Sequence, residues 1–207
     1  TIGIISCNRL HYLRPLIESA RICIEYDNLE WIVVDNASIE EGLREYVDSL
    51  SFVQIKKFRE RRSPSTEHLE AMNYIIERSS SDYVMLLSDD LQFIVRGGWM
   101  RDLVEFAETY PNLGTVIFDA QRRSTLNELF PANRNLRQKL TGSGKWNRYQ
   151  VSSGSEFFGY GKQKAGIAGA GINPFTRKAT WQRLGPWRAT GSQTVADSTG
   201  GGEDDML

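Results

Sequence analysis

The 207-residue sequence predicts an α/β domain with a mostly parallel central sheet flanked by helices. In the first half of the chain, short β-branched segments alternate with longer segments whose apolar residues recur at helical spacing. Such alternation is typical of parallel strands joined by right-handed crossovers. The strands also end in polar residues, which puts the polar chemistry at the edge where open parallel sheets bind their ligands.

The strands of the first half are short apolar segments bounded by polar or turn-forming residues. We predict them at 1–6 (TIGIIS), 30–34 (EWIVV), 52–56 (FVQIK) and 83–87 (YVMLL). The continuous apolar run YVMLL is the pattern expected of a central strand that is buried on both faces.

Helices are expected between these strands, because apolar residues there fall on one helical face. We predict them at 11–26, 39–50, 64–79 and 99–110. The third has a clear start signal, with Ser63 as N-cap and Pro64 in the first turn.

The second half is less regular, so we predict one domain with a regular half, 1–120, and an irregular half, 121–207. A strand is expected at 114–118, and residues 121–164 are interpreted as loops that include a hairpin. Small residues mark a further strand at 166–174, where another group can approach the backbone. A short helix is predicted at 177–184, with Gly185 as its C-cap.

Composition excludes several functional classes. A net charge of −1 argues against a nucleic-acid partner, because neutralising many phosphates needs a basic surplus. No apolar run reaches the ~18–20 residues that span a bilayer, and no signal-peptide pattern opens the chain, so we expect a cytoplasmic location. Cys7 and Cys23 match no metal spacing and are expected to be buried, reduced thiols. Both ends look cut, so we expect either a domain of a longer protein or disordered terminal tails.

The pair Asp89 and Asp90 follows the buried YVMLL strand. Two carboxylates at such a position suit a hard divalent cation shared with substrate phosphates, which would neutralise charge on a departing diphosphate. A turn capped by two acidic residues is the alternative. Asp35 ends a neighbouring strand, where it is interpreted either as an acceptor for a base or ribose or as a local Asx-turn.

Positive charge is predicted at the same edge. Arg9, Arg59, Arg61 and Arg62 lie in its loops, and the helix that starts near Pro64 points free N–H groups at the crevice. His68, one turn into that helix, is a candidate phosphate contact. Solvated surface arginines would give the same pattern.

A third acidic signal lies at Glu203 and Asp204, after a Gly-rich loop. Displacement at an anomeric carbon needs a carboxylate that takes the proton of the acceptor hydroxyl. An acidic first turn of a helix is the simpler interpretation of these two residues.

In this order the motifs resemble the GT-A fold glycosyltransferases, especially the inverting family 2 group. Segments 6–9 (SCNR) and 31–38 (WIVVDNAS) are similar to its first nucleotide-binding loop and to its strand ending in a base-binding Asp. Segment 82–90 (DYVMLLSDD) resembles the strand that leads into the metal-binding DxD motif. Segments 171–187 (GINPFTRKATWQRLGPW) and 201–207 (GGEDDML) resemble its strand, basic helix and turn, and then its acidic base motif.

The resemblance implies a role for each matching residue. Asp90 would ligate Mn²⁺ or Mg²⁺, Asp204 would be the general base, and Glu203 would hold acceptor or donor hydroxyls. Independently of the resemblance, we expect Trp187, next to the Gly-Pro turn, to line the acceptor side. Trp181 is a second stacking candidate, although a core position is the simpler interpretation. The nucleotide would be bound by Cys7, Asn8, Arg9, Asp35, Ser88 and Asp89. His68 is added to these nucleotide contacts from its place on the helix and not from the resemblance.

The implied function is transfer of a hexose from a nucleotide-diphospho-sugar, UDP being preferred, to a hydroxyl of a glycan or glycoprotein with inversion. Residues 1–120 would then be the nucleotide-sugar-binding half and 121–207 the acceptor half. The sequence departs from the DxD pattern at Ser88, and residues 66–68 and 72–73 stand where many relatives have an Arg on the helix, so the diphosphate contact stays open.

Three alternatives remain at this point. A sugar nucleotidyltransferase shares the architecture but needs a Gly-rich loop after the first strand, and residues 6–13 (SCNRLHYL) contain no glycine. A non-catalytic sugar- or nucleotide-binding domain would not require both Asp90 and Asp204. A retaining transferase would not need a base at Asp204.

Overall fold

The computed structural model describes residues 1–57, 60–111, 115–117, 146–160 and 174–186. The strands are β1 Ile2–Ser6, β2 Trp31–Asp35, β3 Gln54–Lys57, β4 Tyr83–Ser88, β5 Thr115–Ile117, β6 Trp146–Gln150, β7 Glu156–Tyr160 and β8 Pro174–Arg177. The helices are α1 Leu10–Cys23, α2 Leu43–Ser49, α3 Pro64–Arg78, α4 Trp99–Thr109 and α7 Lys178–Leu184. None of these described helices is long and apolar enough to cross a membrane.

Six strands form one sheet in the order β3-β2-β1-β4-β8-β5. The first four are parallel to one another, whereas β8 runs antiparallel to both of its neighbours, β4 and β5. The predicted α/β class with a mostly parallel sheet is therefore confirmed. Strand β1 is central, which brings the residues that follow it between the ends of β2 and β4.

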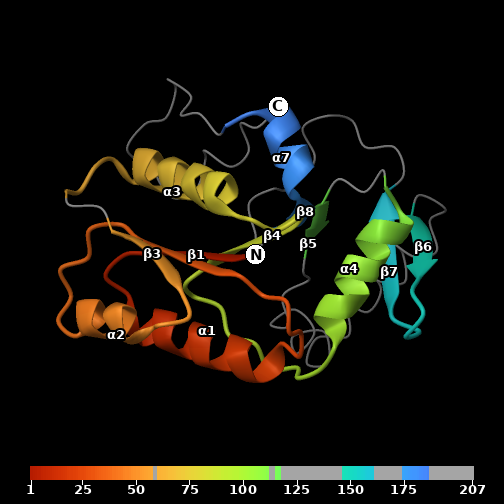
Figure 1. Cartoon of the computed structure of the whole chain (residues 1–207), viewed down its shortest axis with the longest axis horizontal. Coiled ribbons are helices and arrows are strands. Elements are labelled where there is room, and N and C mark those ends of the chain that lie inside the picture. The colour runs from red at the N-terminus through yellow and green to blue at the C-terminus, as the bar shows by residue number, and fades with distance from the viewer. Residues whose placement is uncertain (58–59, 112–114, 118–145, 161–173, 187–207) are drawn as a thin grey trace, which may run out of the picture.

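Helices cover both faces of the sheet. Figure 1 shows α3 and α7 on one face and α1 and α2 on the other. Strand β2 feeds both layers: Val33 belongs to the apolar cluster with α1, α2 and α4, and Ile32 and Val34 belong to the cluster with α3 and Trp181. This period of two is the expected result of a strand buried on both faces. The alternative of Trp181 as a core residue is therefore the one observed.

Strand β1 and helix α3 approach each other closely. A Cβ atom on Gly3 would lie 2.4 Å from Ile75 Cγ2, so only glycine fits here without a shift of the helix. The contact joins the start of β1 to the last turn of α3 and so packs this helix closely against the sheet.

The elements predicted within the described residues are present, with shifted boundaries. The helix predicted at 39–50 begins only at Leu43, because Gly42 has a φ of +78° and the backbone N–H groups of Ile39 and Glu40 bond to Asn8. The helix predicted to reach residue 26 ends at Cys23, because Ile24 is extended and pairs with Gly97.

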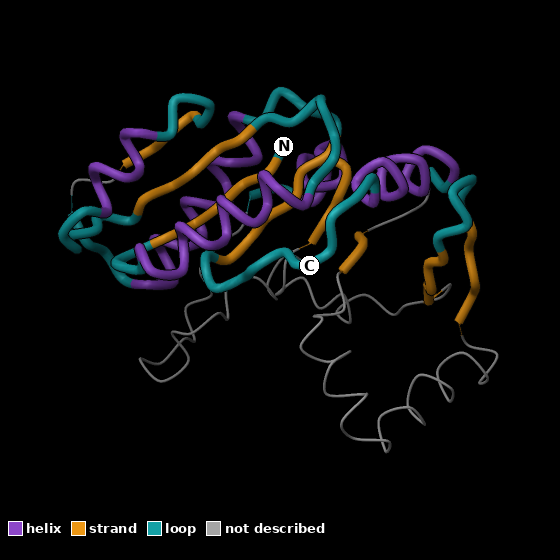
Figure 2. Tube along the Cα trace, turned by 90° about the horizontal axis from the view of Figure 1, so that it is seen from below, coloured by secondary structure: helices purple, strands orange, loops and turns teal. Residues whose placement is uncertain are grey.

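The second half contains the predicted hairpin, formed by β6 and β7. Both views place it beside α4 at one end of the molecule (Figures 1 and 2). Glu105 and Asp102 of α4 accept hydrogen bonds from Ser152 and Ser155, which connect the two strands. The strand predicted at 166–174 overlaps β8 only at Pro174; the rest of that range lies outside the described residues. Gly185 ends α7 with a φ of +88°, as the C-cap prediction requires.

Candidate functional site

The carboxyl ends of β1, β2 and β4 lie level with one another. In the strand register, Ser6 pairs with Asp35 and Ile5 pairs with Ser88. The predicted polar residues that follow or end these strands therefore meet at one edge of the sheet. These residues are Cys7, Asn8, Arg9, Asp35, Ser88, Asp89 and Asp90.

Asp89 links β4 to β1 from a buried position. Its Oδ2 accepts a hydrogen bond of 2.8 Å from the Ser6 hydroxyl, and its Oδ1 accepts one of 3.1 Å from Arg9 Nη1. Burial raises the pKa of Asp89 above the ordinary carboxyl value, while the hydrogen bonds from Ser6 and Arg9 act in the opposite direction. Because both oxygens of Asp89 are bonded within the protein, this carboxylate joins two strand ends.

Asp90 differs from its neighbour in exposure. The side chain of Asp90 is 52% exposed and that of Asp89 only 6%, and Arg9 Nη1 lies 3.9 Å from Asp90 Oδ2. Within the described ranges, no three His, Cys, Asp or Glu side chains are grouped so as to enclose a metal ion. An open carboxylate of this kind fits a Mg²⁺ or Mn²⁺ ion that takes its other ligands from phosphates and water.

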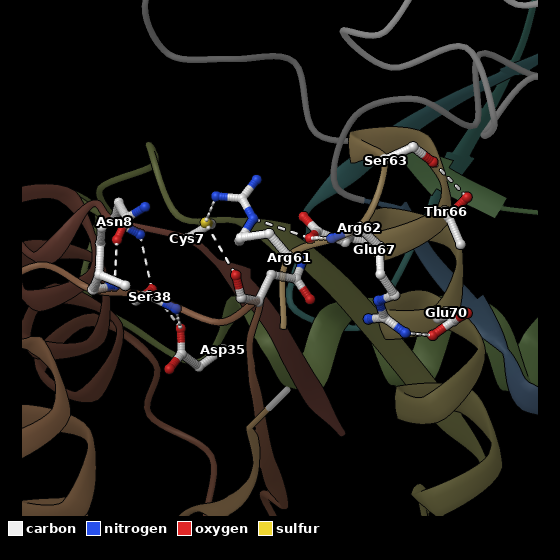
Figure 3. Close-up of polar contacts among 12 residues, drawn as sticks. Cys7, Asn8, Asp35, Ser38, Arg61, Arg62, Ser63, Thr66, Glu67 and Glu70 are labelled. Atoms are coloured by element: carbon white, nitrogen blue, oxygen red, sulfur yellow. Dashed lines mark hydrogen bonds and ion pairs between the residues drawn. The ribbon is translucent and has the colours of Figure 1, made fainter. Parts of the chain in front are cut away.

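Asp35 is buried at the end of β2 and is engaged locally. Its Oδ1 accepts a hydrogen bond from the hydroxyl of Ser38 and one of 3.2 Å from the backbone N–H of the same residue (Figure 3). The local-turn interpretation of Asp35 is thus correct as far as it goes. Among the described residues, no hydrogen bond reaches Oδ2, which leaves one oxygen for a ligand N–H or hydroxyl.

Asn8 connects the loops after β1 and β2. It has a φ of +52°, in the left-handed region that asparagine tolerates better than most residues. Its backbone N–H donates to Ser38 Oγ at 2.8 Å, and its Oδ1 accepts from the backbone N–H of Ile39 at 2.7 Å and Glu40 at 3.2 Å. Glu40 in turn accepts from the backbone N–H of Leu10 at 2.8 Å. The two loops therefore hold one conformation through polar contacts.

Cys7 faces the connection between β3 and α3. Its Sγ donates to the backbone oxygen of Asn36 at 3.2 Å and accepts from Arg61 Nη1 at 2.9 Å (Figure 3). Cys7 is half-buried, so the prediction of two buried thiols holds for Cys23 and is wrong for Cys7. The reason is that Cys7 follows β1 at the edge of the sheet, whereas Cys23 is the last residue of α1 and is buried there. Burial raises the pKa of the Cys7 thiol, and the charge of Arg61 opposes that shift.

The start of α3 carries the remaining predicted groups. Ser63 occupies the N-cap position before Pro64, but its hydroxyl bonds to Thr66 Oγ1 and not to the helix backbone. His68 lies half-buried on the same helix. Arg62 forms an ion pair with Glu70. Arg59, Trp187, Glu203 and Asp204 lie outside the described residues.

Four residues of this network were not expected from the sequence: Ser6, Ser38, Glu40 and Glu67. Ser38 had a signal, because a serine three residues after a strand-ending Asp often bonds back to it. Glu67 had none, since an acidic residue in the first turn of a helix is ordinary.

Comparisons with known proteins agree with the fold described above. The family model described as "Glycosyl transferase family 2" matches residues 1–179. A curated relative, the uncharacterized protein y4gI of Sinorhizobium fredii (strain NBRC 101917 / NGR234), is 29% identical over 111 residues, which cover 53% of this chain and 12% of that protein.

Solved structures share the fold at low sequence identity. The mannosyltransferase PcManGT of Pyrobaculum calidifontis, in complex with GDP-Man and Mn²⁺, has a TM-score of 0.58 and 16% identity, covering 95% of this chain and 49% of that one. TarS 1-349 of S. aureus, in complex with UDP-GlcNAc, has a TM-score of 0.52 and 11% identity, and the match covers 86% of this chain and 45% of that one. The chain thus spans less than half the length of the solved structures it matches.

Proposed function

The chain belongs to glycosyl transferase family 2 and has the GT-A fold, and we propose that it transfers a hexose from a nucleotide-diphospho-sugar, with UDP as the preferred nucleotide, to an acceptor hydroxyl. The acceptor would be a glycan or a glycoprotein. The observation that carries the proposal is the convergence of Asp35, Asp89 and Asp90 on one edge of the sheet, with Arg9 and Arg61 beside them.

The nucleotide would lie across the ends of β2, β1 and β4. Asp35 would accept a hydrogen bond from the base or ribose through Oδ2. Ser88 and His68 are proposed as further nucleotide contacts, while Asp89, which is bonded to Ser6 and Arg9, would keep the strand ends together. Open parallel sheets bind ligands at this edge because the loops that follow neighbouring strands meet there.

Asp90 is the proposed protein ligand of a divalent metal. Its half-exposed carboxylate can reach a cation that is otherwise bound by phosphates and water. A bound Mn²⁺ or Mg²⁺ ion would stabilise negative charge on the leaving diphosphate. Arg9, 3.9 Å from Asp90, adds positive charge at the same place.

Asp204 is proposed as the general base, with Glu203 holding a substrate hydroxyl. The Asp204 carboxylate would take the proton of the acceptor hydroxyl. At the same time the hydroxyl oxygen would bond to the anomeric carbon and the nucleoside diphosphate would leave from the opposite side, which inverts the configuration. We expect Asp204→Asn to lower turnover by roughly 10²–10⁴-fold with donor binding unchanged. An unaltered turnover, or a product with retained configuration, would exclude this role.

Trp187 is proposed to line the acceptor side. We expect Trp187→Ala to raise the acceptor KM more than the donor KM, because an aromatic face stacks on the sugar that it contacts. An unchanged acceptor KM would contradict the assignment.

The function is tested by a thermal-shift screen of nucleotides and nucleotide-sugars with and without Mn²⁺. UDP- and GDP-sugars both belong in the screen, because the structural relatives were solved with one or the other. A ligand at a hundred times its Kd stabilises the folded state by about 2.7 kcal/mol, which is readily measured. Absence of a shift with every nucleoside diphosphate would overturn the proposal.

A further inference from the structure

Arg61 reaches from the connection between β3 and α3 back over the end of β1. Its Nε donates to Glu67 Oε1 at 3.0 Å, and its Nη1 lies 2.9 Å from Cys7 Sγ (Figure 3). The side chain of Arg61 is 48% exposed. One guanidinium thus bridges two segments that are far apart in the sequence while much of it faces the edge that we propose for the nucleotide.

Glu67 pairs with this arginine from a buried position. The carboxylate is 3% exposed and also accepts a hydrogen bond from the backbone N–H of Arg62. A buried carboxylate is costly unless it is paired, so the contact with Arg61 is favoured even without ligand. Glu67 therefore fixes both the path of residues 61–62 and the direction of the guanidinium, and less ordering remains to be done when a ligand binds.

Arg61 also keeps more capacity for an anion than Arg9 does. The hydrogen bond to Glu67 raises the pKa of Arg61 above its already high ordinary value, so the group stays charged. Arg9 is shared by two carboxylates, Asp89 and Asp90. Among the described residues, Arg61 has only the buried carboxylate of Glu67 as an ion-pair partner, and its Nη2 makes no hydrogen bond.

The order of groups along the edge identifies the anion. Asp35 ends β2, Cys7 and Arg61 lie at the end of β1, and Asp90 follows β4. A nucleotide whose base lies at Asp35 and whose metal-bound end lies at Asp90 must cross the end of β1. The part that crosses β1 includes the ribose and the phosphate attached to it, which is the α-phosphate. We infer that Arg61 binds this α-phosphate and that Glu67 is its positioning residue. This inference rests on the proposed function and adds a contact to it.

The test compares uridine, UMP and UDP on the 207-residue chain by titration calorimetry, with competition titrations for weak ligands. Metal-free buffer removes any attraction that runs through a metal bound at Asp90. We expect Arg61→Gln to lower the affinity for UMP and UDP by about 10- to 100-fold, which is the usual contribution of a hydrogen bond to a charged group. The affinity for uridine should stay unchanged. If the affinity for uridine fell equally, or the affinity for UMP did not fall at all, the inference would be overturned. Should the screen select GDP, the guanosine series is used instead.

Arg96→Gln is the matched control. Arg96 is an exposed arginine with one carboxylate partner, Glu25, beyond the last turn of α1. Because a crossover helix starts at the carboxyl end of its first strand and returns to the other edge, this pair lies away from the proposed site. We expect all three affinities to stay at the wild-type value in Arg96→Gln.

Glu67 is tested through its coupling to Arg61. Glu67→Ala should lower the affinity for UMP about as much as Arg61→Gln does. The double variant should bind UMP no more weakly than Arg61→Gln alone, because both substitutions remove the same contact to the phosphate. Additive losses would show that Glu67 acts only on the fold. If Glu67→Ala does not fold, Glu67→Gln takes its place; it retains a carbonyl acceptor for both N–H groups, and we expect a smaller, still non-additive, loss.

Failure of this inference differs from failure of the proposed function. A wild-type chain that binds no nucleoside diphosphate would overturn both. A wild-type chain that binds UDP, together with an Arg61→Gln variant that binds it equally well, would overturn only the role of Arg61.

Discussion

The two sides of the candidate site use their polar groups differently. On the β2 side, formed by Asn8, Asp35, Ser38 and Glu40, side-chain oxygens bond mainly to backbone N–H groups of the neighbouring loops. On the β4 side, formed by Ser6, Arg9, Asp89 and Asp90, side chains bond to one another, and one carboxylate stays half-exposed. The β2 side therefore has a shape set by the backbone, whereas the β4 side has charge available.

The adjacent residues Asp89 and Asp90 show what separates these uses. Both follow the same buried strand, yet Asp89 bonds to the end of β1 and Asp90 faces outward. A carboxylate whose oxygens are bonded inside the protein stabilises the fold, and one that is left open can bind a cation. This distinction between Asp89 and Asp90 can be tested by three substitutions and one measurement of reactivity.

Asp90→Ala should give the largest loss of activity. We expect turnover of a nucleotide-sugar to fall by at least about 100-fold and its dependence on Mn²⁺ to disappear, because metal stabilisation of a leaving group is worth several kcal/mol. Metal titrations of the activity measure this. Asp82→Ala, an exposed Asp at the other end of the same strand, is the control and should retain wild-type turnover. A variant of Asp90 that still responds to Mn²⁺ would refute the metal role.

Asp89→Ala should mainly reduce stability. It leaves the buried Ser6 hydroxyl without its partner and removes the Arg9 contact, so we expect the free energy of unfolding to fall by about 1–3 kcal/mol. Denaturant unfolding measures this, and Asp90→Ala is the comparison, with a change within about 0.5 kcal/mol expected at its exposed position. Equal losses in the two variants would remove the distinction between them.

Ser38→Ala tests the β2 side. The hydroxyl donates to Asp35 and accepts from the backbone N–H of Asn8, and we expect its loss to cost about 1 kcal/mol of stability and less than tenfold in nucleotide affinity. The effect is modest because the backbone N–H of Ser38 still bonds to Asp35. Ser49→Ala, on the exposed end of α2, serves as the control for nucleotide affinity. A loss of binding as large as that of Asp90→Ala would make the β2 side more than a scaffold.

The smallest effect is expected in the alkylation of Cys7. Because its pKa is raised, the thiolate fraction of Cys7 at neutral pH is lower than in an unperturbed cysteine. The alkylation rate should therefore be slow at pH 7, rise as the pH approaches the raised pKa, and fall when nucleotide covers the edge. Mass spectrometry of the Cys7 peptide measures the rate, and Cys23, which is buried, is the internal reference. Fast alkylation at pH 7 that nucleotide does not slow would contradict this.

The strands were the part of the fold that the sequence predicted best. Apolar segments such as YVMLL are removed from water only when both faces of the strand are buried, and the polar residues that follow them mark where the strand ends. Boundaries that depend on distant contacts were predicted less well. The helix after β2 starts late in part because of the left-handed Gly42, which is a local feature. The other cause is that Asn8 bonds to the backbone of Ile39 and Glu40, about thirty residues away in the chain, and no local propensity carries that information.

By itself, the sequence determined the alternation of strands and helices, the parallel sheet, and the gathering of Asp35, Asp89 and Asp90 at one edge. These follow from local periodicity and from the rule that parallel strands end on the same side. The three-dimensional packing was needed to show which carboxylates are bonded internally and which stay open, and that Arg61 pairs with Glu67 and contacts Cys7. The reason is that burial and pairing are properties of side chains brought together from separate loops, and a linear pattern does not contain them.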